Sequence, residues 1–488
     1  MDPQQVAELE TARDLANQVH TEIAAQHWLT AAKIARRAVT LPGNDRDAAL
    51  WGELGLALLR TQDFLGANSA LDTAVQVNRY RADLWRLKAQ ALAAQARLDD
   101  AKTGQQRLDA ASVAWDDAEI YTGSVTGKLE ILAEHCDALL AAGRWQAAEG
   151  LIRQAEELAA NAPGWAERRA QAQLGPFAER YAAAMQASDF AAAIAACDEA
   201  LRVVPNAPGW AEQRAQAADA QIAAEQERQR RDRLIPARLQ SLGFVLAPNV
   251  DAIIPPTVEV PAGPFTMGSD KRRDREAQDD EPQIALNLAA FHIGVYPVTV
   301  AEYACALAAK AKDVSQPEDW AAQQQHPDHP VVEVSWRAAV AYAAWLSEVT
   351  GEVWRLPTEA EWEKAARGTD GRIYPWGNQW DKARANTRNG GPGTTTPVGK
   401  YAEKGDASPY GCHDMAGNVW EWTSSIYRQC YDRNNSEDDS DRTSDRVLRG
   451  GSWDSNPRGA RAAFRSGSDW SIWGSGRGFR LARGRVGW

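Results

Sequence analysis

The first 221 residues carry apolar side chains at a spacing near 3.6, which predicts a run of amphipathic helices. Trp51 and Trp85 begin two equivalent helices, 34 positions apart. The heptapeptide Asn-Ala-Pro-Gly-Trp-Ala-Glu occupies 161–167 and again 206–212, a period of 45, and its Pro-Gly step separates one helix from the next. The pattern therefore predicts an internally repeated, all-α domain over 1–221.

The shorter period, together with Trp-x-x-Leu-Gly at 51–55, resembles the tetratricopeptide repeat. Two-helix units of this kind stack into a solenoid because none of them can bury its apolar face alone, and solenoid surfaces commonly hold other proteins. We therefore expect a protein partner at the repeats, with a scaffold or an oligomerisation arm as the alternative. The 45-residue period is longer than that of the tetratricopeptide family, so elongated or irregular repeats are expected. We also expect the stretch 110–128 to interrupt the array.

The pattern changes at 222–241, where Glu and Arg crowd a strongly polar stretch. This predicts a charged helical linker with solvated side chains, which trypsin should cut first. From Leu242 onward the helical period fades, and thirteen of the twenty tryptophans lie beyond that residue. Large aromatic side chains suit a second domain, 242–488, that has long loops and little regular secondary structure.

Short alternating runs in the second half predict strands at 258–269 and 291–298. Three predicted helices start at side-chain caps, namely Thr299 before the helix 300–309, Ser335 before the helix 336–349, and Thr358 with Glu361 in a capping box.

A series of sequence blocks follows in order, including Asp414–Trp422, Arg449–Trp453 and Gly478–Arg480. From about 255 to 484 they resemble the formylglycine-generating enzyme (sulfatase-modifying factor) family. The resemblance implies an α+β, C-type-lectin-like domain with a short twisted antiparallel sheet, two flanking helices and long ordered loops. The predicted fold class is multidomain: an N-terminal all-α helical-repeat solenoid followed by this C-terminal domain.

The resemblance also shows which chemistry the chain lacks. Catalytic members bind copper through two cysteines just after the Gly-Gly-Ser-aromatic block, and those places fall here at Ser455 and Ala460. Neither side chain supplies the thiolate that Cu(I) selects. Iron-dependent relatives of the ergothioneine pathway carry histidines on a separate helical domain, and the N-terminal half supplies no such set. We therefore predict no catalytic residues, no copper and no iron.

One metal remains a candidate. Asp414, Gly417, Val419 and Glu421 match a calcium-binding segment of the family, in which side-chain oxygens and two backbone carbonyls face one ion. Hard oxygen ligands of this kind suit Ca²⁺. A calcium-free hydrogen-bonded turn is the alternative.

The stretch 454–477 combines Ser and Gly with Trp and Arg, which is the chemistry of an adaptable binding surface. Its layout resembles the variable proteins of diversity-generating retroelements, which carry their diversified residues between Gly-Gly-Ser-Trp and Gly-Phe-Arg. We expect Trp453, Phe464 and Phe479 to anchor the segment in the core. Trp470 and Trp473 are expected to be exposed as binding residues, and the alternative is that both are buried in the core. The predicted ligand-binding surface consists of Asp454, Ser455, Asn456, Gly459, Ser466, Ser468, Trp470, Ser471, Ile472, Trp473, Ser475 and Arg477.

Composition narrows the cellular setting. A net charge of −12 and a pI near 5.3 argue against a nucleic-acid partner. Five scattered cysteines without a C-x-x-C pair predict free thiols in a reducing compartment. Neither a signal peptide nor an apolar run of membrane-spanning length is visible, so we expect no membrane association and a cytoplasmic location.

These observations favour a non-catalytic ligand-binding protein. Its C-terminal domain would display a surface, diversified by a retroelement, for a protein or another macromolecular ligand, and its repeats would bind a protein. Two alternatives stay open. One is an oxidoreductase of the formylglycine-generating or ergothioneine-pathway type with displaced catalytic residues. The other is an adaptor in which the helical repeats are the binding part.

Overall fold

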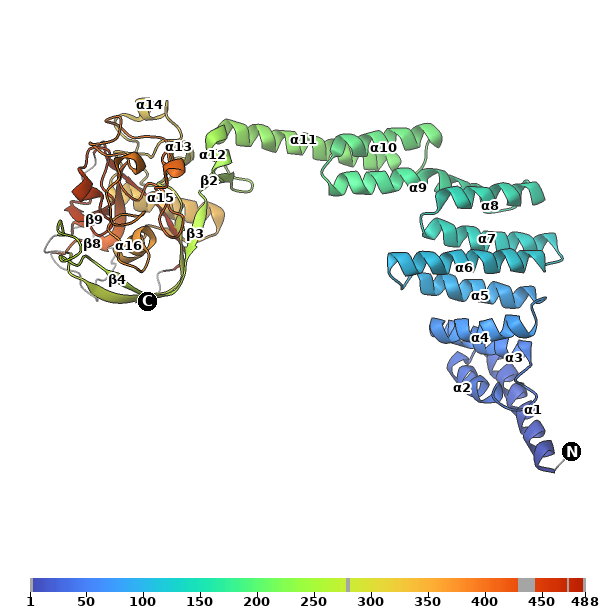
Figure 1. The fold of residues 1–488 in the computed structure, drawn as a ribbon. Helices are drawn as coiled ribbons and strands as arrows, with labels where there is room; N and C mark the ends of the chain where they lie inside the picture. Colours follow the sequence, from blue (N-terminus) through green and yellow to red (C-terminus); the bar gives the residue numbers. More distant parts are fainter. Residues whose placement is uncertain (1–2, 278–280, 429–443, 472–473, 486–488) are drawn as a thin grey trace. The chain divides into compact units, whose positions relative to one another are not determined.

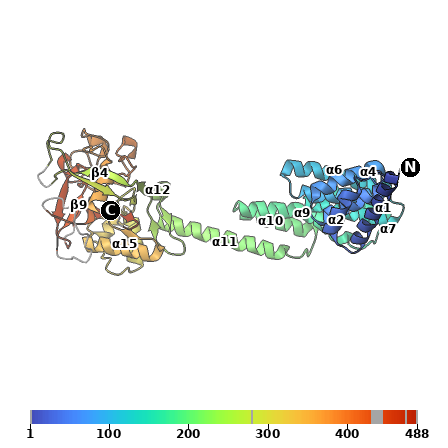
Figure 2. The same ribbon diagram turned by 90° about the horizontal axis from the view of Figure 1, so that it is seen from below.

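The chain folds into two compact units, Met1–Ala223 and Ala224–Trp488. The computed structural model describes residues 3–277, 281–428, 444–471 and 474–485. The first unit is all helical and the second combines short strands with helices (Figures 1 and 2). This confirms the predicted fold class.

Helices of the first unit pack as consecutive antiparallel hairpins, each formed by an odd-numbered helix and the next even-numbered one (Figure 1). Alanine and leucine fill the seams between neighbouring helices. The helices are α1 (Pro3–Ala24), α2 (Trp28–Ala38), α3 (Ala48–Arg60), α4 (Phe64–Val77), α5 (Ala82–Ala96), α6 (Ala101–Ile120), α7 (Val125–Ala141), α8 (Trp145–Leu158), α9 (Trp165–Gln186), α10 (Phe190–Val203) and α11 (Trp210–Leu234).

The 45-residue repeat reappears as repeated geometry. Trp165 and Trp210 are the first residues of α9 and α11, and both are buried. The glycines before them, Gly164 and Gly209, have φ of 84° and 83°. Only glycine adopts this left-handed conformation without a steric cost, so the Pro-Gly step fixes how each connection enters the next helix.

The expected interruption at 110–128 is wrong. Helix α6 continues to Ile120, and α7 begins at Val125 after a short turn. Ser124 caps α7 by accepting a hydrogen bond from the Gly127 amide. The Thr-Gly-Ser stretch between the helices is therefore an ordinary inter-hairpin connection, and the array continues through it.

The stretch 222–241 differs from the predicted solvated linker. The second unit begins at Ala224, inside α11, so the linker is not a separate segment. Beyond it, Ile235 and Leu239, the latter in α12 (Ala237–Ser241), are fully buried in the core of the second unit. Most of the charged residues are exposed, but Arg230 is half-buried and pairs with Asp251, and the apolar residues that follow join the C-terminal core.

Two four-stranded sheets organise the second unit, in the orders β10-β9-β8-β11 and β3-β6-β12-β7. Most pairs are antiparallel, as expected, and β11 runs parallel to β8. The strands are β1 (Val245–Leu246), β2 (Ile253–Ile254), β3 (Thr257–Val260), β4 (Gly263–Met267), β5 (Ile284–Leu288), β6 (Phe291–Gly294), β7 (Trp354–Arg355), β8 (Trp420–Ile426), β9 (Arg446–Arg449), β10 (Arg465–Ser468), β11 (Arg477–Phe479) and β12 (Ala482–Arg483).

The predicted helix caps are present. Thr299 and Glu302 form a capping box at α13, Ser335 caps α15, and Thr358 with Glu361 forms a second box at α16. The helices of this unit are α13 (Val300–Ala308), α14 (Trp320–Gln323), α15 (Trp336–Thr350) and α16 (Glu359–Arg367).

Four cysteines, Cys136, Cys197, Cys305 and Cys412, are buried free thiols. Cys430 lies outside the described residues. Within the part of the chain that the structure describes, no helix combines the length and apolarity needed to cross a bilayer.

Candidate ligand-binding site

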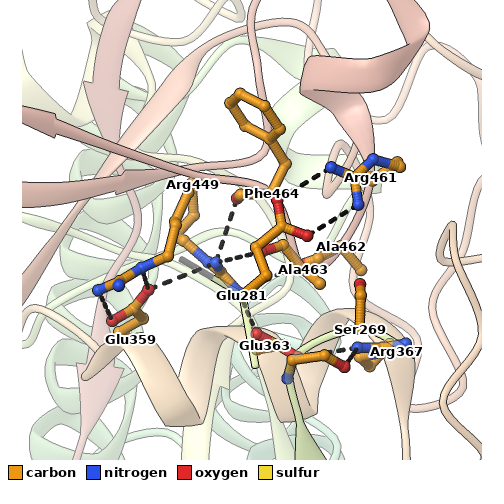
Figure 3. Close-up of polar contacts among 12 residues, drawn as sticks. Ser269, Glu281, Glu359, Glu363, Arg367, Arg449, Arg461, Ala462, Ala463 and Phe464 are labelled. Atoms are coloured by element: carbon orange, nitrogen blue, oxygen red, sulfur yellow. Dashed lines mark hydrogen bonds and ion pairs between the residues drawn. The ribbon is translucent and has the colours of Figure 1, made fainter. Parts of the chain in front are cut away.

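The stretch 454–477, called the terminal segment from here on, is held by a buried guanidinium group that precedes it in the sequence (Figure 3). Arg449, the last residue of β9, is fully buried and donates hydrogen bonds to the carbonyls of Ala462 and Ala463, each at 2.9 Å. It also pairs with the carboxylate of Glu363 and lies 3.4 Å from that of Glu359. Arg449, which is not part of the predicted surface, thus holds the backbone of the loop that carries that surface.

Further arginines of the segment are paired in the same way (Figure 3). Arg461 donates two hydrogen bonds of 2.9 Å to Glu281, and Arg465 donates two of 2.8 Å to Glu359. Burial opposes ionisation of Glu363, but the charges of Arg449 and Arg367 outweigh it and hold its pKa below the usual range. The buried arginines and glutamates neutralise each other, so we interpret this cluster as a structural support for the terminal segment.

The expected core anchors are only partly correct. Phe479 in β11 is fully buried and packs edge-on against Tyr303 and Tyr342. Trp453 and Phe464 are partly exposed instead. The buried arginines, rather than these two rings, hold this side of the segment.

The predicted surface residues divide by burial. Gly459 and Ser468 are buried, which corrects their place on a displayed surface: the first lies in a short 3-10 turn and the second ends β10 beside Arg446. Ile472 and Trp473 lie outside the described residues. Exposed positions are Asp454, Asn456, Ser471 and Ser475, and half-buried ones are Ser455, Ser466, Trp470 and Arg477.

Trp470 and Ser471 line a cavity of about 560 Å³. The segment 313–318, Glu333 and the start of α15 also line it. The guanidinium carbon of Arg337 lies 5.4 Å from the centre of the Trp470 ring, a cation–π contact. The cavity therefore offers an aromatic face beside charged groups, as small binding sites commonly do.

Two residues of the cavity wall have a strained backbone. Asp313 and Glu333 have φ of 61° and 59°, the left-handed region that few residues other than glycine occupy. The Glu333 amide donates to the carbonyl of Gly474, and its carboxylate accepts from the amide of Asp319. Glu333 therefore links the terminal segment to the loop across the cavity, and such strain persists where the surroundings enforce it.

Sequence reasoning found Trp470 and Ser471 but missed Arg337, Glu333 and the 313–318 segment. These residues precede Trp470 by more than a hundred positions. No local pattern marks them, because only the packing of α15 against the terminal segment brings them to the cavity.

The places of the family's copper thiolates hold no metal-binding group. The hydroxyl of Ser455 accepts a hydrogen bond of 2.9 Å from the amide of Ser452. Ala460 is fully buried and has no donor atom. The residues present do not fit Cu(I), which needs soft sulfur ligands.

The candidate calcium segment forms a hydrogen-bonded turn. Glu421 accepts two hydrogen bonds from Arg480 and one from the Trp362 indole, which uses three of its roughly four acceptor positions. The carbonyl of Gly417 accepts from the amide of Val419. Burial, together with the nearby charge of Asp406, raises the pKa of Asp414 to about 7.

No three His, Cys, Asp or Glu side chains meet as a metal-ligand group within residues 3–277, 281–428, 444–471 and 474–485. Calcium binding at Asp414, Gly417, Val419 and Glu421 stays a prediction. A calcium-dependent rise in melting temperature that Asp414→Ala abolishes would support it.

Comparison with known proteins agrees with the predicted family. Residues 245–485 match the family described as Sulfatase-modifying factor enzyme 1-like domain. The C-terminal unit is a sulfatase-modifying factor domain.

Relatives of this domain include proteins named as enzymes and proteins named as inactive. The chain is 33% identical over 269 residues to a hercynine oxygenase of Mycolicibacterium smegmatis, covering 47% of this chain and 61% of that protein. It is 40% identical over 174 residues to an inactive C-alpha-formylglycine-generating enzyme 2 of Bos taurus, covering 32% of this chain and 51% of that protein. The chain thus spans about half to three-fifths of these relatives.

Among solved structures, variable protein 1 of Treponema denticola is 22% identical. The alignment covers 49% of this chain and 98% of that one, with a TM-score of 0.40.

Proposed function

We propose that this chain is a non-catalytic ligand-binding protein. Its sulfatase-modifying factor domain would bind a macromolecular ligand at the cavity beside Trp470 and at the exposed positions of the terminal segment. The observation that carries the proposal is the cavity itself, where the Trp470 ring and the charged side chains of Arg337 and Glu333 meet a strained wall. Ser455 and Ala460 support the absence of the family's copper chemistry.

The proposal includes diversification of the terminal segment by a retroelement. Side chains at Asp454, Asn456, Ser471 and Ser475 are exposed, while the backbone between them is held by buried arginines. Exposed substitutions usually change stability by no more than about 0.5 kcal/mol, so such a surface tolerates replacement. A near-copy of the DNA for residues 449–480, differing at adenines and beside a reverse-transcriptase gene, would support this step.

The proposed setting is a cytoplasmic protein whose helical repeats bind a second protein. An array of hairpins offers a long surface that is built from neighbouring units. The repeats would then position the ligand-binding domain on a partner.

The test uses an array of proteins from the host organism, probed with the full chain. We expect Trp470→Ala and the set Asp454→Ala, Asn456→Ala, Ser471→Ala and Ser475→Ala to remove binding of at least one target without unfolding the domain. The matched control is Trp376→Ala, another half-buried tryptophan of the same domain, in the 374–380 turn. An unchanged binding profile in every variant would contradict the proposal.

A separate measurement tests the alternative enzyme. The purified chain is incubated with Cu(I) and a Cys-containing sulfatase peptide, and separately with Fe(II) and hercynine. We expect neither product above a no-protein control. Turnover in either assay would contradict the proposal that the chain is non-catalytic. The proposed ligand binding would then still be tested by the protein-array experiment.

A further inference from the structure

Four consecutive hairpins place an exposed apolar side chain at the same position. The second helix of each hairpin ends in a large hydrophobic residue: Val77 in α4, Ile120 in α6, Leu158 in α8 and Val203 in α10. Their exposed fractions are 39%, 69%, 37% and 48%. Single exposed apolar residues are normal on a protein surface. Recurrence at one structural position in four successive units is a pattern that scatter does not explain.

These residues share one edge of the first unit, where each hairpin connects to the next (Figure 1). Tyr80, between α4 and α5, and Val125, at the start of α7, are exposed at the same edge. The ring of Tyr80 packs edge-on against Tyr121, 5.7 Å between centroids, so neighbouring connections touch. Tyrosine is a frequent anchor of protein interfaces.

Two acidic residues near the apolar row recur with the 45-residue period of the sequence repeat. Glu167 and Glu212 lie in the first turns of α9 and α11, 45 positions apart, like Leu158 and Val203. Both are exposed, and neither forms an ion pair with any residue in the described ranges. An acidic group in a first turn stabilises its own helix. That effect does not explain why the exposed apolar residues Leu158 and Val203 recur with the same 45-residue period as the two glutamates.

We propose that the row Val77, Tyr80, Ile120, Leu158 and Val203, the apolar edge, binds an extended polypeptide segment carrying apolar and basic side chains. Its apolar groups would cover the row, and its Lys or Arg side chains would pair with the glutamates. The proposal rests on the proposed protein-binding role of the repeats and names the surface and the partner's chemistry.

Helix spacing sets the repeat of the partner. Neighbouring helices pack roughly 8–10 Å apart, so equivalent positions two helices apart are roughly 16–20 Å apart. An extended chain advances about 3.3 Å per residue. The bound segment would therefore present an apolar side chain about every five or six residues, with Lys or Arg near the two that face Glu167 and Glu212.

The opposite edge supplies a matched control. Leu29, Leu65 and Leu98 are exposed near the turns inside the hairpins. They do not continue as a row, since Gln146 and Ala191 hold the second helical position in α8 and α10. These leucines have the same chemistry and are also exposed. Their acidic neighbours are engaged within the unit, since Asp63 pairs with Arg36 and Asp99 pairs with Arg107.

The experiment selects binders from a displayed library of random peptides of about 18 residues, long enough to reach four positions of the row. The full chain is the bait. We expect selected peptides to be enriched in Lys or Arg and apolar residues, and their binding to weaken as salt screens the charges. The triple variant Ile120→Ser, Leu158→Ser, Val203→Ser should bind them roughly tenfold or more weakly.

Two further variants separate the contributions. Leu29→Ser, Leu65→Ser, Leu98→Ser should leave affinity unchanged, and Glu167→Gln with Glu212→Gln should remove the preference for basic peptides. Circular dichroism and melting curves check that each variant is folded, as expected for exposed substitutions.

Several outcomes would overturn the inference. Equal affinity of the two triple variants, or selection of neutral or acidic peptides, excludes this surface as a basic-segment site while leaving the repeats as protein binders. Self-association that the Ile120, Leu158 and Val203 substitutions abolish, measured by sedimentation velocity, would make a second copy the occupant. Failure to select any peptide that binds the first unit would instead remove the proposed protein-binding role itself.

Discussion

Arg449 shows how one residue can support a surface that it does not join. Its guanidinium group bonds to the carbonyls of Ala462, Ala463 and Phe464 and pairs with Glu363. A buried charge left without its partner is far more costly than an exposed one. The terminal segment therefore depends on this residue for its conformation while its exposed side chains remain free to differ.

Replacing this residue should be severe. We expect Arg449→Met to lower the free energy of unfolding by about 3–5 kcal/mol, because buried Glu363 loses one of its two arginine partners and three carbonyls lose a donor. Urea unfolding followed by tryptophan fluorescence measures the change. The control is Arg388→Met, which removes an exposed ion pair with Asp454 and should cost far less stability, because water screens such a pair. Equal losses in both variants would contradict the framework role.

Glu302 carries a pH dependence that has nothing to do with ligand binding. Its carboxyl is fully buried; one oxygen accepts from Thr299, and the other has no hydrogen-bond partner among the described residues. Burial is the main cause that raises its pKa from 4.5 to about 8. Between these values the native state keeps a proton that the unfolded state releases, so the contribution of Glu302 to stability is fully present below pH 4.5 and is lost as the pH rises through about 8.

Glutamine should remove that dependence. We expect Glu302→Gln to keep the capping interaction, to flatten the fall in unfolding free energy between pH 5 and 8, and to be more stable than the parent at pH 8. Unfolding in urea at successive pH values gives the slope, which reaches about 1.4 kcal/mol per pH unit for one proton. Glu348→Gln, at an exposed position of α15, is the control. Parallel profiles for parent and Glu302→Gln would contradict the assignment.

At this scale the sequence predicted residue types better than their partners. The blocks containing Arg449, Glu421 and Phe479 were placed correctly in the family domain. Glu421 is predicted as a calcium ligand, and that prediction stays open, but its hydrogen bonds to Arg480, 59 positions away, had no signal in the sequence. Trp453 was expected in the core and is only partly buried. Pairing across such distances depends on packing, which no local pattern encodes.

Elements with strong local signals were predicted well. Capping residues marked the starts of α13, α15 and α16, because a cap is a local hydrogen-bond pattern. The stretch 222–241 was predicted less well. Its many charged residues indicate a solvated helix, but Ile235 and Leu239 pack in the core of the second unit. The supposed break at 110–128 failed for a similar reason: Gly and Thr in one connection resembled the end of an array.

The length of the C-terminal fragment should matter accordingly. We expect a fragment of residues 224–488 to be more stable than one of 242–488 by about 3–6 kcal/mol, since the shorter one lacks the buried side chains of Ile235 and Leu239. Urea midpoints compare the two fragments. The variant Ile235→Ala, Leu239→Ala in the longer fragment should reproduce most of the loss. Identical midpoints for all three would show that these residues do not contribute to the core.

At the scale of the whole molecule, the two units have separate cores. The hydrophobic clusters of the first unit contain none of the residues that form those of the second. Units built in this way commonly unfold independently.

Calorimetry of the full chain should therefore show two transitions. We expect Arg449→Met to lower only the transition of the second unit. Trp165→Ala, which removes a buried ring at the start of α9, should lower only that of the first. A single transition that both substitutions shift together would mean that the units are energetically coupled.

The matching heptapeptides at 161–167 and 206–212 have a consequence for how such an array can lengthen. Each ends a hairpin and starts the next helix through the same Pro-Gly step, with nearly equal φ at Gly164 and Gly209. Misaligned recombination between the two coding stretches would insert or delete 45 residues in frame. Because both junctions have the same geometry, the product would gain or lose one complete hairpin and keep its stacking, so the reach of the arm could change by whole units between close descendants of this gene.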